Sequence, residues 1–182
     1  MIKLVIFVAV TAVLAYFTRG SIRSPRHHGF YRFLAWEAIL GLLLLNSDYW
    51  QIEPPPRYEP LSALLLVVSI YLVAHGTYLL RAYGRADGSR TDQALRPFER
   101  TTRLVTTGLF RYIRHPLYSS LLFLAWGMFL KDTSWLAGAL TLAATVSLVV
   151  TGKTEERECV QYFGSPYREY MQRTRMFIPL LF

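Results

Sequence analysis

The chain has 182 residues, of which 53% are hydrophobic, 15% aromatic and only 18% charged, and its formal net charge is +8. The apolar residues fall in long blocks instead of alternating with polar ones, which is typical of an integral membrane protein and argues against a soluble globular domain. Because the arginines lie in the segments between these blocks, an anionic membrane surface explains the basic charge and no nucleic-acid partner is expected. The single cysteine, Cys159, excludes an internal disulfide and a CxxC metal site, and no metal is predicted.

Five apolar blocks approach the roughly 20 residues that a helix needs to cross a bilayer. In chain order they are Ile2–Phe17, Phe33–Leu45 extended to about Trp50, Leu61–Leu80, Pro116–Leu130 and Trp135–Val150. The last two blocks are joined only by KDTS, which predicts an antiparallel hairpin. The fourth block is short for a full span. The first block is interpreted as a retained helix, because no small-residue cleavage site of a signal peptide follows it.

The charges of the connecting segments predict the orientation. The segments after the first and third blocks and the tail are rich in arginine, whereas DYWQIEPPPRYEP holds one arginine against three acidic residues. The positive-inside rule then places the N terminus outside and the C terminus in the cytoplasm. We therefore expect one all-α domain over residues 1–182 in a bacterial inner membrane, with about five transmembrane helices. The third loop and a C-terminal amphipathic helix would form a cytoplasmic cap.

The stretch RYIRHPLYSS, residues 111–120, is the first candidate for chemistry. Pro116 fits the first position of a helix, where a missing N–H costs nothing, and it disfavours helical geometry at His115. His115 is thus expected at a helix entrance, with Tyr118 one turn inside and Arg114 at the level of the lipid headgroups. The alternative is purely topological, with arginines anchoring a helix that proline starts.

A pair of carboxylates follows the fifth block. Glu155 and Glu156 lie where the chain leaves the acyl region, and carboxylates at such a depth are costly unless they are paired or bind a cation. They could simply pair with Arg157 or Lys153. The predicted hairpin, however, brings them to the end of the helix that neighbours His115, so both polar motifs are expected to face one site.

Three further polar residues lie within the apolar blocks. Glu37 lies in the second block, and Tyr71 and His75 share one face of the third because they are four residues apart. A lone histidine in such a helix is often only a packing residue. We nevertheless expect Glu37, Tyr71 and His75 to line a route by which a lipophilic acceptor enters between spans.

The residues from about Thr106 to Pro179 resemble a known family. GLFRYIRHPLY, a hydrophobic hairpin, EE, FGSPYREY and RTRMFIP follow in the order typical of the isoprenylcysteine carboxyl methyltransferase family, which is related to the phospholipid N-methyltransferases. HGFYRFLAWEAILGLLLLN is similar to short bacterial members. The resemblance implies an S-adenosylmethionine-dependent membrane methyltransferase whose cofactor-binding part covers about residues 100–182. Because no strand precedes a GxGxxG motif, a Rossmann domain is excluded.

The roles expected from this resemblance fall on residues of the predicted cytoplasmic side. The expected cofactor-binding residues are Gly108, Leu109, Tyr112, His115, Tyr118, Glu155 and Glu156. The expected catalytic residues are Arg173, Glu156 and Arg114, because an arginine can clamp an acceptor carboxylate and no strong base is needed for a nucleophile that is already ionised.

The resemblance favours carboxyl O-methylation of an isoprenylcysteine-like acceptor. N-methylation of a phospholipid amine is the alternative, and it would require a base such as Glu156, Glu37 or His75. Since bacteria generally lack prenylated CaaX proteins, another lipid or a small hydrophobic acid or thiol also remains open as the acceptor. Alternatives from other classes are an NADPH-dependent membrane reductase and a non-enzymatic membrane protein. The sequence does not predict the oligomeric state.

Overall fold

The computed structural model describes residues 1–23, 26–51, 57–85 and 99–179, and these residues form an all-α fold of six α-helices with short 3-10 turns, as expected. The bounds of the α-helices are α1 Ile2–Ile22, α2 His28–Leu45, α3 Glu59–Tyr83, α4 Pro116–Phe129, α5 Trp135–Phe163 and α6 Ser165–Arg173. Two shorter 3-10 helices are η1 (Asn46–Gln51), which extends α2, and η3 (Gly108–Arg111), which precedes α4.

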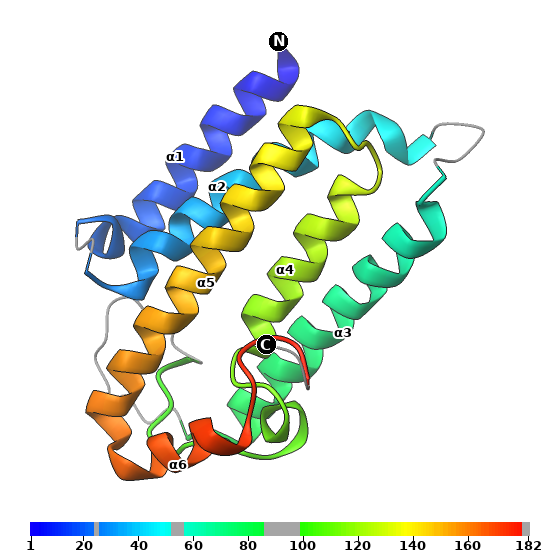
Figure 1. Cartoon of the computed structure of the whole chain (residues 1–182). Coiled ribbons are helices and arrows are strands. Elements are labelled where there is room, and N and C mark those ends of the chain that lie inside the picture. Colours follow the sequence, from blue (N-terminus) through cyan, green and yellow to red (C-terminus); the bar gives the residue numbers. More distant parts are fainter. Residues whose placement is uncertain (24–25, 52–56, 86–98, 180–182) are drawn as a thin grey trace.

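The five long helices lie side by side in an order that differs from their order in the chain (Figure 1). Helix α5 packs against α2 on one side and α4 on the other, while α1 packs against α2 and α3 against α4. Helices α1 and α3 therefore form opposite edges of the bundle. The predicted hairpin of α4 and α5 lies at its centre.

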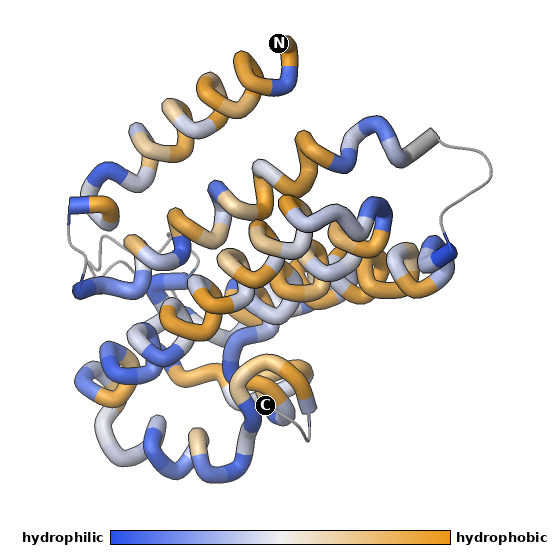
Figure 2. Tube along the Cα trace, turned by 45° about the horizontal axis from the view of Figure 1, so that its top comes forward, coloured by the Kyte–Doolittle hydropathy of each residue, from blue (hydrophilic) through white to orange (hydrophobic). Residues whose placement is uncertain are grey.

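Four helices, namely α1, α3, α5 and the run His28–Tyr49 that contains α2, are long and apolar enough to cross a membrane. Helix α4 has only 14 residues and is shorter than such a span. Its bounds match the predicted block Pro116–Leu130, which was expected to be short for a full span, so four of the five predicted blocks form helices of spanning length. Figure 2 shows the apolar residues along the long helices and the hydrophilic ones gathered around α6 and its neighbours. The orientation in the membrane stays a prediction.

Helix α5 is much longer than the apolar block that predicts it. Its first turn is capped by Ser134, whose hydroxyl accepts a hydrogen bond from the backbone N–H of Ala137 at 3.3 Å. It continues past Val150 to Phe163 because this polar stretch is rich in good helix formers, and it ends at Gly164, which has φ +70°. The glutamates that were expected after a helix therefore lie on it, and their side chains point in fixed directions.

Helices α3 and α4 approach each other through small and polar residues. The hydroxyl of Ser62 donates to the carbonyl of Gly127 at 2.8 Å, and the hydroxyl of Ser69 donates to the carbonyl of Ser120 at 2.7 Å. A side chain at Gly127 would place its Cβ 3.0 Å from the Leu66 side chain. Close backbone approach with hydroxyl-to-carbonyl bonds is a common way for helices to associate in lipid.

The tail folds back and pairs with the segment that leads into α4. The backbone N–H of Arg114 donates to the carbonyl of Arg175 at 2.8 Å, and that of His115 donates to the carbonyl of Met176 at 3.1 Å. The side chain of Phe177 is 1% exposed and lies beside Gly152, where an added Cβ would meet its ring at 3.1 Å. The tail thus holds the backbone of His115 in place through these hydrogen bonds. Of the predicted third-loop cap, residues 86–98 lie outside the described residues.

Candidate active site

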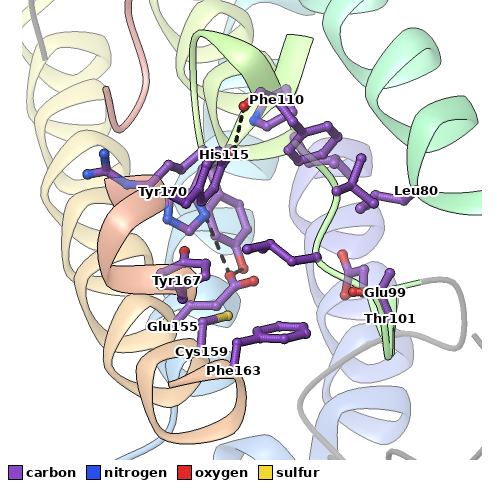
Figure 3. Close-up of a pocket in the computed structure, with 16 residues that line it drawn as sticks. Leu80, Glu99, Thr101, Phe110, His115, Glu155, Cys159, Phe163, Tyr167 and Tyr170 are labelled. Atoms are coloured by element: carbon purple, nitrogen blue, oxygen red, sulfur yellow. Dashed lines mark hydrogen bonds and ion pairs between the residues drawn. The ribbon is translucent and has the colours of Figure 1, made fainter. Parts of the chain in front are cut away.

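A pocket lies beneath α4, between the polar end of α5 and the helix α6 (Figure 3). Its walls come from the end of α3, the segment of residues 99–118, the last third of α5, and α6. The residues that line it are Leu80, Glu99, Thr101, Leu104, Val105, Phe110, Arg114, His115, Pro116, Leu117, Tyr118, Glu155, Cys159, Phe163, Tyr167 and Tyr170. The two motifs that the sequence singles out contribute Arg114, His115, Pro116, Leu117, Tyr118 and Glu155 to this lining.

Glu155 forms the polar centre of the pocket with two residues of the RYIRHPLYSS stretch. The hydroxyl of Tyr118 donates to Oε2 of Glu155 at 2.5 Å, and Nδ1 of His115 lies 3.9 Å from the same oxygen. The rings of His115 and Tyr118 are stacked with their centroids 5.4 Å apart. Both rings are held because Pro116 starts α4 directly after His115, whose backbone is non-helical, with φ −122° and ψ 62°.

Glu156 points to a neighbouring position and pairs with an arginine. Nε of Arg114 donates to Oε1 of Glu156 at 2.5 Å, and the same guanidinium donates through NH1 to the carbonyl of Thr174 at 2.5 Å. Nε2 of His115 lies 3.4 Å from Oε1 of Glu156. Arg114 is thereby held by both α5 and the tail, so its charge is largely compensated before any ligand binds.

The opposite wall of the pocket is aromatic and comes from α5, α6 and η3. The hydroxyl of Tyr170 donates to the carbonyl of Phe110 at 2.7 Å, which joins α6 to η3, and the ring of Tyr167 stacks on Phe163 at 6.3 Å. Burial raises the pKa of Tyr167 and of Tyr170 well above the ordinary value for tyrosine. Both hydroxyls therefore stay protonated and neutral in the physiological range.

A third carboxylate of α5 lies outside the sequence-based prediction. Oε2 of Glu158 is 2.5 Å from Nδ1 of His28, and Oε1 is 3.3 Å from Nδ1 of His27, at the start of α2. One turn further along α2, Arg32 forms a buried ion pair of 2.9 Å with Glu99 of the pocket. The sequence contains the acidic stretch EERE and the basic stretch RHHGFYR, which are complementary in charge. No local pattern predicts that they meet, because only the packing of α2 on α5 brings them together.

The residues predicted to act together are only partly brought together. His115, Tyr118, Glu155 and Arg114 line the pocket, and Glu156 is paired with Arg114 at its side. Three of the expected cofactor residues belong to η3 or follow it and do not line the pocket themselves: Gly108, Leu109 and Tyr112. Gly108 has φ +60°, a backbone conformation that favours glycine, and a Cβ there would come within 2.7 Å of a terminal methyl group of Leu79 on α3. Arg173 is exposed at the end of α6 and does not line the pocket.

Of the three residues expected to bind the acceptor, Glu37 lies apart from Tyr71 and His75. Glu37 accepts a hydrogen bond of 2.6 Å from Thr11, so it faces α1 at one edge of the bundle. Tyr71 is 54% exposed and stacks on His75 at 5.5 Å on α3, at the opposite edge. Glu37 and His75 thus lie on helices at opposite sides of the bundle, and their role in acceptor binding stays a prediction.

The pocket suits a cationic, partly aromatic ligand better than a metal. Within the described part of the chain no cluster of three histidine, cysteine, aspartate or glutamate residues has the geometry of a metal site. Glu155 offers a carboxylate, and the aromatic wall offers rings that attract a cation or stack on a heterocycle. Nε2 of His115 is buried, and its polar neighbour is Oε1 of Glu156 at 3.4 Å.

Comparisons with known proteins identify methyltransferases. The family described as "Phospholipid methyltransferase" matches residues 60–165. Methanethiol S-methyltransferase 1 of Bradyrhizobium diazoefficiens is 31% identical over 154 residues, which cover 78% of this chain and 52% of that protein. Methanethiol S-methyltransferase of Pseudomonas deceptionensis is 26% identical over 143 residues, covering 75% and 52%. Methanethiol S-methyltransferase 2 of B. diazoefficiens is 34% identical over 153 residues, covering 79% and 58%.

The chain thus spans about half the length of these curated relatives. They act on a thiol and are not isoprenylcysteine carboxyl methyltransferases, so the expected isoprenylcysteine acceptor is not supported. The comparison also favours a methyltransferase over the reductase and non-enzymatic alternatives. No solved structure matches the chain.

Proposed function

Because this chain belongs to the phospholipid methyltransferase family, whose methyltransferases use S-adenosylmethionine, we propose that it transfers a methyl group from this cofactor to a small hydrophobic thiol. The names of the three relatives support the thiol over a carboxylate. The site supports it as well, because an acceptor that arrives protonated needs a base, and the pocket offers Glu155 and His115.

The observation that carries the proposal is the position of Glu155. It lies in a pocket with one aromatic wall, at the end of a long apolar helix, and it is fixed by Tyr118 and flanked by His115. A carboxylate in such surroundings both attracts a cationic ligand and accepts a proton from a neutral acceptor. We assign these two tasks to Glu155.

S-adenosylmethionine supplies an electrophilic methyl group on a sulfonium. The residues that would hold it are Glu155, His115, Tyr118 and the aromatic wall of Phe110, Phe163, Tyr167 and Tyr170. A small alkyl thiol is a weaker acid than the cysteine side chain, whose pKa is about 8.5, so it is mostly protonated at neutral pH, and the thiolate is the nucleophile. The chain therefore has to accept the thiol proton, exclude water, and hold the acceptor in line with the methyl group. Arg114 has the different task of holding Glu156 and the tail.

The experiment uses the full chain purified in detergent, with methyl-labelled S-adenosylmethionine and three acceptors: methanethiol, a farnesylcysteine carboxylate and phosphatidylethanolamine. We expect label in the volatile thioether. Label only in the methyl ester would support the isoprenylcysteine reading, and an absence of binding to S-adenosylhomocysteine would contradict all the methyltransferase readings. Glu155→Gln is the matched variant, because it keeps the size of the side chain and removes its charge.

Phospholipid N-methylation is the second candidate. The description of the matching family favours it, and an amine acceptor also has to lose a proton before it is methylated. In the assay above, label confined to the phosphatidylethanolamine headgroup would identify this reaction and would exclude the thiol proposal.

A further inference from the structure

The described lining of the pocket contains two carboxylates, and they come from different parts of the chain. Glu155 lies on α5, whereas Glu99 precedes η3 together with Thr101. Figure 3 shows Glu99 and Thr101 on the side of the pocket opposite Tyr167. Glu155 has a task in the proposed function, whereas Glu99 has none.

Glu99 is held in place by a buried arginine of α2. NH1 of Arg32 donates to Oε2 of Glu99 at 2.9 Å, and the side chains of the two residues are 5% and 14% exposed. The guanidinium carbon of Arg32 lies 5.1 Å from the centroid of the Trp36 ring on the same helix. An ionised carboxylate only accepts hydrogen bonds, so this pair presents Glu99 to the pocket as an acceptor in a fixed orientation.

The pair with Arg32 also decides which kind of ligand group suits Glu99. Because the arginine compensates its negative charge, Glu99 attracts a free cation less strongly than an uncompensated carboxylate does. It still accepts hydrogen bonds from neutral hydroxyl groups, since a carboxylate has about four lone-pair positions and one N–H of Arg32 occupies only one of them. Glu155 differs, because its hydrogen-bond donor is the neutral hydroxyl of Tyr118.

The structure of the cofactor assigns such hydroxyl groups to this part of the pocket. S-adenosylmethionine joins its sulfonium to its adenine through a ribose that carries two neighbouring hydroxyl groups. With the sulfonium at Glu155 and the adenine on the aromatic wall, as proposed above, the ribose lies between them and its buried hydroxyls need acceptors. Glu99 is the other carboxylate among the described lining residues, and its two oxygens match two neighbouring hydroxyls.

We propose that Glu99 binds the ribose hydroxyl groups of S-adenosylmethionine, with its carboxylate held in place by Arg32. This inference rests on the proposed function, because it requires the cofactor to lie in this pocket. No local sequence pattern singles out Glu99, because its partner lies 67 positions away on α2.

The test compares ligands that differ only in the ribose. S-adenosylhomocysteine and its 2′-deoxy and 3′-deoxy analogues are titrated by calorimetry into the full chain in detergent, as wild type and as Glu99→Gln. In the wild type we expect at least one deoxy analogue to bind about tenfold more weakly, as for the loss of a hydrogen bond to a charged group. In Glu99→Gln the same change of ligand should weaken binding less than about threefold, because a neutral amide oxygen is a weaker acceptor.

A general structural defect weakens all these ligands alike, so only a direct contact changes the difference between them. Glu158→Gln is the matched control, because Glu158 also pairs with a buried residue of α2 but does not line the pocket. This control should keep the wild-type difference between the ligands. The proposal is overturned if Glu99→Gln keeps it too, or if the wild type binds both deoxy analogues as tightly as S-adenosylhomocysteine.

A further ligand tests whether Glu99 binds the ammonium group of the cofactor instead. 5′-Methylthioadenosine keeps the ribose but lacks the amino-acid part. Glu99→Gln should therefore weaken the binding of 5′-methylthioadenosine about as much as that of S-adenosylhomocysteine. An unchanged affinity for 5′-methylthioadenosine would assign Glu99 to the amino-acid part and overturn the proposal.

A second variant keeps the test decisive if Glu99→Gln folds poorly. Arg32→Met combined with Glu99→Leu removes both charges of the pair, so no unpaired buried charge is left. This double variant should also lose the difference between the ribose and deoxyribose ligands, and a retained difference overturns the proposal. A wild-type chain that binds S-adenosylhomocysteine as expected but methylates no thiol would instead contradict the proposed function, so the two failures are distinguishable.

Discussion

The two ends of the α4–α5 hairpin both contain buried charge, but they use it differently. At the turn, Lys131 pairs with Glu59 at 2.5 Å, and the side chain of Lys131 is only 6% exposed. Beside it Asn46 donates to the carbonyl of Met128 at 2.5 Å, which ties α2 to α4. At this end, each of these two contacts joins residues of neighbouring helices or of the turns beside them.

At the other end, three carboxylates within four residues of α5 each face a different element. Glu155 faces the start of α4, Glu156 faces Arg114 and the tail, and Glu158 faces the start of α2. A pocket lined by His115, Tyr118 and Glu155 opens at this end, opposite the aromatic wall. Buried charge at the turn thus serves packing, whereas part of the buried charge at this end lines a pocket.

The largest expected effect tests the pocket end. Glu155→Gln should lower methyl transfer by at least about a hundredfold, the lower range for the loss of a general base, while the folded protein remains. Turnover with labelled cofactor measures the first effect, and thermal unfolding in detergent measures the second. A variant with near wild-type turnover would mean that Glu155 only stabilises the packing of the helices, as the Lys131–Glu59 pair does at the turn.

The next effect tests the turn end. Lys131→Met should reduce the free energy of unfolding by about 2 kcal/mol, less than for a fully buried pair because Glu59 is 30% exposed. Its affinity for S-adenosylhomocysteine should not change. The double variant Lys131→Met with Glu59→Leu should recover most of the stability, because no unpaired charge is left. A loss of cofactor affinity in the single variant would contradict the division between the two ends.

A smaller effect is expected for the hydrogen bond that joins α6 to η3. Tyr170→Phe should cost about 1 kcal/mol of stability, the usual value for one hydrogen bond, and should weaken S-adenosylhomocysteine binding a few fold. Titration calorimetry measures the binding. Unfolding curves and affinities that match those of the wild type would show that the aromatic wall is fixed without this bond.

The smallest effect is expected on the exposed face of α3. Tyr71→Phe removes a hydroxyl from a residue that is 54% exposed and outside the pocket, so turnover of the acceptor should stay within about twofold. The same measurement on Glu37→Gln, at the opposite edge of the bundle, provides the comparison. A selective rise of KM for the acceptor in either variant would support the prediction that this residue lines the route of the acceptor.

The sequence by itself determined the helices and the two motifs of the pocket. Blocks of about 20 apolar residues predict helices because a backbone in lipid has to satisfy its own hydrogen bonds. Pro116 and the short KDTS link predict where α4 starts and that α5 runs back beside it. From these local rules follow the proximity of His115 and Tyr118 to Glu155, and the pocket contains all three.

Only the tertiary structure decided how far α5 extends, which partner each of its carboxylates meets, and which residues stay outside the pocket. Apolar periodicity loses its signal once a helix leaves the apolar region, so the turns of α5 beyond Val150 were read as a tail. Glu158 meets His28 because α2 packs beside α5, a contact between residues 130 positions apart that no local pattern encodes. The same packing order separates Glu37 from His75, since it places α1 and α3 at opposite edges of the bundle.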